Sequence, residues 1–190
     1  MKKILCVLLL LLTGCSSKTS MIEIQKHVYV EKEFKDSWLE TNEFGDSYIK
    51  EELQGGYHYH FDQQFLEIFF NTGGKIELYN YSIKKNDLII SGEMIPPKTI
   101  RLVHPHLDNV TSEGVIIHEL GHYFDEKYQF SSSKQFTKLY KKYRTLFNQK
   151  TKKEYFAECF KEYVGGHQEK VKPFHSYMKT ITQKIRQKNK

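Results

Sequence analysis

Apolar residues alternate with polar ones along the first half of the chain and recur every three or four positions along the second half. The alternation predicts strands over residues 22–31, 75–83, 87–91 and 100–104. The helical spacing predicts long helices over residues 112–128, 151–164 and 173–185, and a further one whose apolar face carries Phe136, Leu139, Tyr140 and Tyr143. Shorter helices are predicted over residues 33–39 and 62–70. Because strands come first and most helices follow, the order indicates an α+β fold.

The N-terminal residues form a pattern of their own. Lys2 and Lys3 precede an apolar run over residues 4–12, which is too short to span a bilayer as a mature helix. The run ends in Leu-Thr-Gly-Cys at residues 12–15, which matches a bacterial lipobox. This match implies cleavage before Cys15, lipidation of its thiol, and a mature protein anchored to the cell membrane and facing outside the cytoplasm. The alternative is an ordinary secretory signal that contains a cysteine by chance.

The rest of the chain has the length of one domain. Removal of residues 1–14 as a signal peptide leaves a short polar tether, residues 15–20, and a single domain over residues 21–190. Cys159 is then the one cysteine in that domain, so no disulfide within the mature chain is expected. Its apolar surroundings indicate a core residue rather than a nucleophile.

The composition of the chain limits the classes of molecule that it is expected to bind. The chain has a formal net charge of +6, with the basic residues concentrated in residues 138–153 and 170–190. Nucleic acid is a poor partner for an exported lipoprotein, so we interpret these segments as solvated helix faces beside an anionic cell envelope. The 13 tyrosines and 13 phenylalanines indicate a folded domain rather than a disordered tail.

The predicted helix over residues 112–128 carries the sequence His-Glu-Leu-Gly-His. His118 and His122 are four residues apart, so both imidazoles project from one face of the helix and can hold one metal ion. Glu119 lies where it can take a proton from a metal-bound water. Gly121 is a poor helix former, and a small residue there can let another backbone or the metal site come close. The alternative is a chance match on an ordinary helix face.

Zinc needs a third protein ligand, with a fourth position left open. Glu154 and Glu158 are also four residues apart and lie on one face of the next predicted long helix but one. One carboxylate can bind the metal, and the other can accept the second ring N–H of a ligating histidine. Weaker candidates for the third ligand are His104, His106, His167 and His175.

His58 and His60 allow a second metal site, but we favour a surface strand, because no acidic or cysteine partner lies beside them in the sequence.

These motifs resemble a known family. Residues 112–117 leading into the metal motif, and Glu-Tyr-Phe-Ala-Glu at residues 154–158, resemble the catalytic domain of the anthrax lethal factor family, which includes the secreted Pro-Pro endopeptidases. Residues 92–104 resemble the segment that precedes the metal helix in that family, and residues 173–185 resemble its C-terminal helix. The resemblance covers roughly residues 92–185 and implies a zincin-like fold, in which a mixed sheet with an edge strand precedes the metal helix and the C-terminal helices.

The resemblance also implies roles for individual residues. One Zn²⁺ per chain would be bound by His118, His122 and Glu154, and Glu119 would be the general base. Glu158 would not bind the metal itself but would contact one of the ligands. Residues 100–103 would form the edge strand, which pairs with an extended peptide or protein substrate.

One position departs from the family pattern. The family usually has a tyrosine seven residues before the ligating glutamate, and Phe147 stands there in this chain. Tyr143 is the nearest substitute for this oxyanion donor, and Tyr140 lies further back. Because one such donor contributes about 10²–10³ in rate, its loss would weaken activity without abolishing it.

The sequence therefore predicts a membrane-anchored zinc metalloendopeptidase. The rival hypothesis is a catalytically silent lipoprotein of zincin fold that binds a partner at the cell surface, and Phe147 is the reason to consider it. A structural zinc site is a third option, but such sites are usually closed by four cysteine or histidine ligands, and this chain has too few cysteines.

Overall fold

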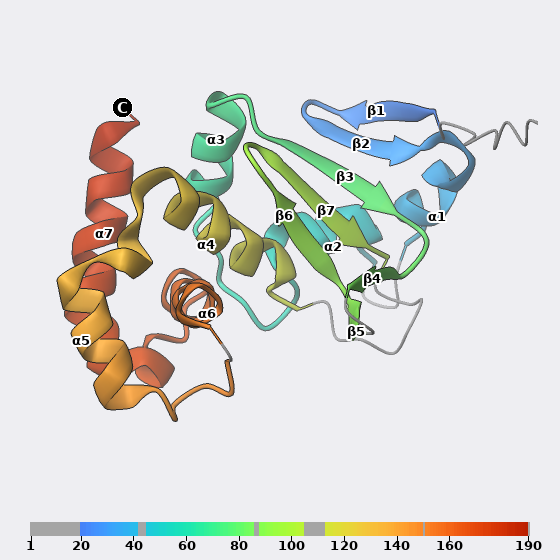
Figure 1. Cartoon of the computed structure of the whole chain (residues 1–190). Helices are drawn as coiled ribbons and strands as arrows, with labels where there is room; N and C mark the ends of the chain where they lie inside the picture. Colours follow the sequence, from blue (N-terminus) through green and yellow to red (C-terminus); the bar gives the residue numbers. More distant parts are fainter. Residues whose placement is uncertain (1–19, 42–44, 86–87, 105–112, 150, 190) are drawn as a thin grey trace, which may run out of the picture.

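The computed structural model describes residues 20–41, 45–85, 88–104, 113–149 and 151–189 (Figure 1). The predicted signal peptide, the lipobox and Cys15 lie outside these residues. Within the described ranges, no helix is both long and apolar enough to cross a membrane.

A mixed sheet of five strands forms one side of the molecule (Figure 1). The order across the sheet is β1 (Met21–Gln25), β2 (Val28–Glu31), β3 (Lys75–Tyr79), β7 (Thr99–Val103) and β6 (Gly92–Ile95). The three central strands β2, β3 and β7 run parallel, and β1 and β6 pair antiparallel at the two edges. The α+β prediction is thus confirmed at the level of a mixed sheet combined with several helices.

Alternation along the central strands separates a buried face from a polar one. The inward residues are fully buried, and they are Val28, Val30, Ile76, Leu78, Ile100 and Leu102. The opposite face carries Glu77, whose carboxylate accepts hydrogen bonds from Lys75, Tyr79 and Arg101. The central strands therefore bury their apolar face in the core and carry ion-paired polar side chains on the other face.

The predicted strand over residues 22–31 is wrong in one respect, because it is a hairpin of two strands. The chain reverses between β1 and β2 at His27, which has a φ of 67°. The backbone N–H of His27 donates to the Glu23 carboxylate at 2.7 Å, which stabilises the turn. Histidine carries no strong turn signal, and the alternating pattern continues through it, so the sequence concealed the reversal.

The predicted edge strand, residues 100–103, is also wrong. This segment forms β7, which pairs with β3 on one side and with β6 on the other, so both of its edges are occupied. The edge strand on this side of the sheet is β6, which precedes β7 and folds back onto it.

Other local predictions need smaller corrections. The predicted strand over residues 75–83 ends at Tyr79, and β4 (Ile83–Lys85) pairs with β5 (Leu88–Ile90) in a separate two-stranded sheet. The predicted surface strand around His58 and His60 is absent from the described structure, where residues 57–60 form a turn and an extended loop. The short helices are α1 (Lys35–Leu39), α2 (Tyr48–Gln54) and α3 (Gln64–Asn71).

The C-terminal half is helical, as its apolar spacing predicts. It contains α4 (Val115–Tyr128), α5 (Lys134–Tyr143), α6 (Lys152–Val164) and α7 (His175–Lys188). Short 3-10 turns cover Lys32–Phe34, Phe130–Ser132 and Gln168–Phe174. Ser133 and Thr151 cap α5 and α6 through their side-chain oxygens, which accept backbone N–H groups three residues later.

Buried aromatic residues hold these helices together. The Phe136 ring on α5 lies 5.3 Å from that of Phe156 on α6 and 5.5 Å from that of Tyr177 on α7. Cys159 is fully buried in the same core, as its surroundings predict. On the other side, α4 packs against both β6 and β7. Helix α6 is therefore fixed between α4 and the last helices.

Candidate metal centre

Two helices approach unusually closely beside the cluster of candidate ligands. A Cβ placed on Gly121 of α4 would lie 2.9 Å from Cα of Ala157 on α6 and 3.2 Å from its carbonyl oxygen. These distances leave no room for a larger side chain, so the small residue lets the backbone of α6 come close, as the sequence predicts. The contact brings the histidine face of α4 over the glutamate face of α6.

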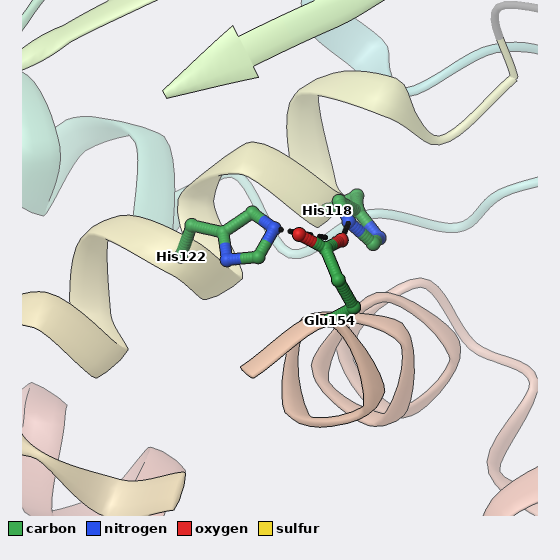
Figure 2. Close-up of side chains that lie close together, drawn as sticks. All are labelled: His118, His122 and Glu154. Atoms are coloured by element: carbon green, nitrogen blue, oxygen red, sulfur yellow. Dashed lines mark hydrogen bonds and ion pairs between the residues drawn. The ribbon is translucent and has the colours of Figure 1, made fainter. Parts of the chain in front are cut away.

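Three side chains from these helices converge at one point (Figure 2). Oε2 of Glu154 lies 3.2 Å from Nε2 of His118 and 3.2 Å from Nε2 of His122. One ligand atom from each residue lies within 4.8 Å of the other two. The predicted ligands are thus brought together, and both imidazoles present Nε2 to the shared space.

The spacing of these atoms fits a small divalent cation. Around a tetrahedral zinc ion with bonds of about 2.0–2.1 Å, neighbouring ligand atoms are about 3.3 Å apart. Two of the three separations between the ligand atoms, both 3.2 Å, agree with this spacing, and all three lie within 4.8 Å. Among the residues that the structure describes, this is the one group of three or more histidine, cysteine or acidic side chains arranged to hold a metal ion.

Glu158 supports His118 from the other side of the ring. Its Oε2 lies 3.2 Å from Nδ1 of His118, so the carboxylate can accept the Nδ1–H and leave Nε2 free for a metal. This is the supporting position that the sequence predicts for Glu158. Only His118 contacts both glutamates, with one ring nitrogen facing each.

The charges of the site shift the pKa values of its members strongly. Burial lowers the pKa of His118, but the hydrogen bonds to Glu154 and Glu158 raise it more, to about 9. Hydrogen bonds from His118 and His122 hold the pKa of Glu154 well below its usual range. In the metal-free protein a proton on His118 therefore supplies part of the positive charge that a metal would provide.

Glu119 is nearly fully buried beside the cluster. It is 6 % exposed, and a backbone hydrogen bond from Met94 on β6 holds its carboxylate. Burial raises the pKa of Glu119 above its ordinary value, although His118 and His122 act in the opposite direction. The link to Met94 joins the motif helix to the edge strand, which sequence patterns could not reveal.

The three ligands and Glu119 lie in an open cleft of about 730 Å³. Its walls are β6, the histidine face of α4 and the first turn of α6. The loop between α5 and α6 also contributes, with Asn148 and Gln149. Sequence reasoning missed these two amides, because nothing in the spacing of the motifs places that loop at the cleft.

The two aromatic positions that raised doubt about the oxyanion donor are partly buried and pack against the hydrophobic core. Tyr143 contacts the ring of Phe174 at 6.1 Å, and its backbone carbonyl accepts a hydrogen bond from the Tyr155 hydroxyl. Phe147 stacks edge-on against the Tyr155 ring at 5.3 Å. No tyrosine is among the described residues that line the cleft. The structure thus gives the predicted oxyanion role of Tyr143 no support.

The alternative histidines have other neighbours. His104 packs between the rings of Trp38 and Tyr48. His167 binds Glu162, and His175 contacts Gln168 and Tyr163. Nδ1 of His58 lies 2.5 Å from Oε1 of Glu113, but His58 belongs to no group of described residues that could hold a metal. His106 lies outside the described residues.

No model of a known protein family matches this chain, and a search of curated proteins finds no match either.

Proposed function

We propose that this chain is a zinc-dependent metallopeptidase with a zincin-like centre, in which His118, His122 and Glu154 bind the metal and Glu119 is the general base. The observation that carries the proposal is the convergence of two imidazole Nε2 atoms and one carboxylate oxygen in an open cleft, with a buried glutamate beside them. Three protein ligands with one open side are typical of catalytic rather than structural zinc sites.

The ligand types favour zinc over the hard cations. Two neutral imidazoles with one carboxylate suit Zn²⁺, whereas Mg²⁺ and Ca²⁺ prefer oxygen ligands. Zinc supplies Lewis acidity when it is bound at such a site, and this polarises a carbonyl group and makes a coordinated water more acidic.

Glu119 supplies the proton transfers. Peptide hydrolysis requires a base that removes a proton from the attacking water and an acid that protonates the departing amine nitrogen. One carboxylate can perform both steps in succession. The raised pKa of Glu119 favours this role, because it increases the affinity of the carboxylate for the proton that it must carry.

Strand β6 supplies the place for the substrate. Its residues Gly92 and Met94 line the cleft, and the strand is the last in the sheet on this side. An extended peptide or protein segment can pair with such an edge as an additional strand. Its backbone would then pass in front of Glu119 and the three ligands. Strand β6, and not residues 100–103, is thus the strand that we propose pairs with the substrate.

The proposed setting is the outer face of a membrane. The apolar run and the Leu-Thr-Gly-Cys sequence at residues 12–15 support a lipid anchor on Cys15. The polar tether, residues 15–20, would then connect the anchor to the folded domain, which starts at β1. We propose no role in nucleic-acid binding.

A second candidate function is a catalytically silent binding protein with the same centre and the same anchor. The observation in its favour is that the cleft contains no tyrosine among its described lining residues, so the usual oxyanion donor of the resembled family has no counterpart there. The buried Glu119 favours the enzyme, because a binding protein has no use for a base beside the metal.

The decisive experiment compares the wild-type protein with Glu119→Gln on an unbiased peptide library. The variant should retain one zinc per chain and lose cleavage by about 10²–10⁴-fold, because the amide cannot accept the proton. Glu67→Gln changes an exposed glutamate on α3 in the same way and should cleave like the wild type. Cleavage by Glu119→Gln at the wild-type rate would disprove the mechanism. Wild-type protein that holds stoichiometric zinc and cleaves nothing would favour the binding protein.

A further inference from the structure

A chain of ion pairs runs along α6 away from the candidate metal centre. Glu158 binds His118 through Oε2, and its other oxygen, Oε1, lies 2.7 Å from Nζ of Lys161. Nζ of Lys161 lies 3.7 Å from Oε1 of Glu162. The three side chains of this α6 ion-pair chain, Glu158, Lys161 and Glu162, are only 14 %, 16 % and 5 % exposed. They are therefore shielded from solvent, unlike a typical surface pair.

Lys161 is held in place by groups from outside its own helix. Its stem passes Gly114, the residue that precedes α4, where a Cβ would lie only 2.9 Å from Cδ of Lys161. Its ammonium group lies 5.9 Å from the centre of the Tyr59 ring. Gly165 leaves room for the same ring, since a Cβ there would lie 2.2 Å from a carbon of Tyr59. The two glycines thus allow Tyr59 and Lys161 to fill the space where α4 begins and α6 ends.

The far end of the ion-pair chain is anchored as well. Glu162 is buried and accepts a hydrogen bond from the Tyr59 hydroxyl at 3.1 Å. Its other oxygen lies 3.0 Å from Nδ1 of His167 and 3.1 Å from Nζ of Lys170. Because three groups hold Glu162, it is a fixed point against which Lys161 can be oriented.

We propose that Lys161 is a positioning residue of the metal centre, which acts on His118 through Glu158. A carboxylate turns easily about its last torsion when only one oxygen is held. In this structure His118 holds one oxygen of Glu158 and Lys161 holds the other, so the carboxylate stays in the orientation that accepts the Nδ1–H of His118. That bond fixes the ring with Nε2 directed into the candidate metal site, towards Glu154. The inference rests on the proposed metal centre and extends its supporting groups by one residue.

The test measures metal affinity in the full chain by competition with a chromophoric chelator, using Zn²⁺ and Co²⁺. Lys161→Met retains most of the stem but removes the charge, and it should weaken binding towards, but not beyond, the about 10–100-fold that losing the direct partner of a ligand costs. The visible absorption of bound Co²⁺ should change as well, because the ring of His118 is no longer fixed. Lys161→Arg retains the charge and should recover part of the affinity.

Lys170→Met is the matched control. It also removes an ion-pair partner of Glu162. The structure shows no contact between Lys170 and Glu158, so metal affinity should stay at the wild-type value. A Glu158→Gln background provides the second check, because Lys161→Met should produce no further loss once its partner is changed. Lys161→Gln replaces Lys161→Met if the latter does not fold.

The possible results distinguish a failure of the positioning role of Lys161 from a failure of the proposed metal centre. Equal affinity in the wild type, Lys161→Met and Lys170→Met overturns the positioning role and leaves the metal centre standing. An equal loss in Lys161→Met and Lys170→Met also overturns it, because the effect would then come from Glu162 rather than from Glu158. A wild-type protein that binds neither Zn²⁺ nor Co²⁺ overturns the proposed centre itself.

Discussion

At the scale of single residues, the centre is a set of opposite charges that compensate one another. His118 lies between two glutamates, and the hydrogen bonds to them raise its pKa to about 9 although burial acts against the charged form. A metal ion needs the neutral ring, because the Nε2 lone pair forms the bond. Protons and metal ions therefore compete for the same nitrogen.

This competition predicts the pH dependence of metal binding. At pH 7 the His118 ring is charged in the metal-free protein, since its pKa of about 9 lies above that pH. Binding must displace this proton, so apparent affinity should rise about tenfold per pH unit towards pH 9 and then level off. Calorimetric titration in buffers of different ionisation enthalpy should show about one proton released per ion at pH 7. Affinity that does not change between pH 7 and 9 would contradict this account.

At the scale of elements, the site depends on how closely α4 and α6 approach. The two helices supply all three candidate ligands, and Gly121 and Ala157 meet where they cross. A shift of one helix by a fraction of an ångström changes the distances between the ligand atoms directly. Stability and metal affinity are therefore coupled at this crossing.

Gly121→Val tests this coupling. The new side chain would overlap the backbone of Ala157, so we expect the free energy of unfolding to fall by about 1–3 kcal/mol and metal affinity to fall with it. Chemical denaturation and chelator competition measure the two effects. Gln183→Val places the same β-branched residue at an exposed position of α7 and should change neither by much. Normal metal affinity in Gly121→Val would show that the close approach is not required.

The elements also show where sequence patterns were sufficient. The long helices follow from local apolar spacing and from the caps at Ser133 and Thr151, all of which are short-range signals. The identity of the edge strand does not follow from such short-range signals. Residues 100–103 and β6 are both short and carry one charged residue each, and only the pairing of β7 with distant β3 decides which of them is left at the edge.

At the scale of the whole molecule, a metal at this site would join two helices that are about thirty residues apart in the sequence. Because the unfolded chain does not hold the three ligands together, an ion that binds the folded form stabilises it by mass action. The stabilisation is about 2.7 kcal/mol when free metal is at a hundred times its dissociation constant.

We therefore expect zinc to raise the melting temperature of the chelator-treated protein by roughly 5–10 °C, as about 1 kcal/mol corresponds to about 2–4 °C in a domain of this size. Scanning calorimetry with and without added zinc measures the shift. Glu119→Gln should show the full shift, because it retains the ligands, whereas His122→Ala should lose most of it. A shift of equal size in His122→Ala would place the metal elsewhere.

The candidate site was predictable as far as its ligands, and less so in its surroundings. Two pairs of residues at helical spacing identify His118, His122, Glu154 and Glu158, since a helix converts spacing into a shared face. The other residues around the site could not be predicted from spacing. Asn148 and Gln149 reach the cleft through a loop, and Met94 reaches it through a strand edge. Lys161 lies outside the cleft lining and contacts Glu158 from a gap left by Gly114. These depend on long-range packing, which no local pattern encodes.

The crossing of the two helices also bears on how relatives of this chain can be recognised. A protein that builds the same centre with the same helix crossing needs a small residue at the position of Gly121, because a Cβ there would lie 2.9 Å from Cα of Ala157. This position lies just before the second histidine of the motif. A search pattern that requires this small residue together with the four polar ones is more selective than the histidine motif alone. It can find members whose remaining sequence has diverged beyond ordinary similarity.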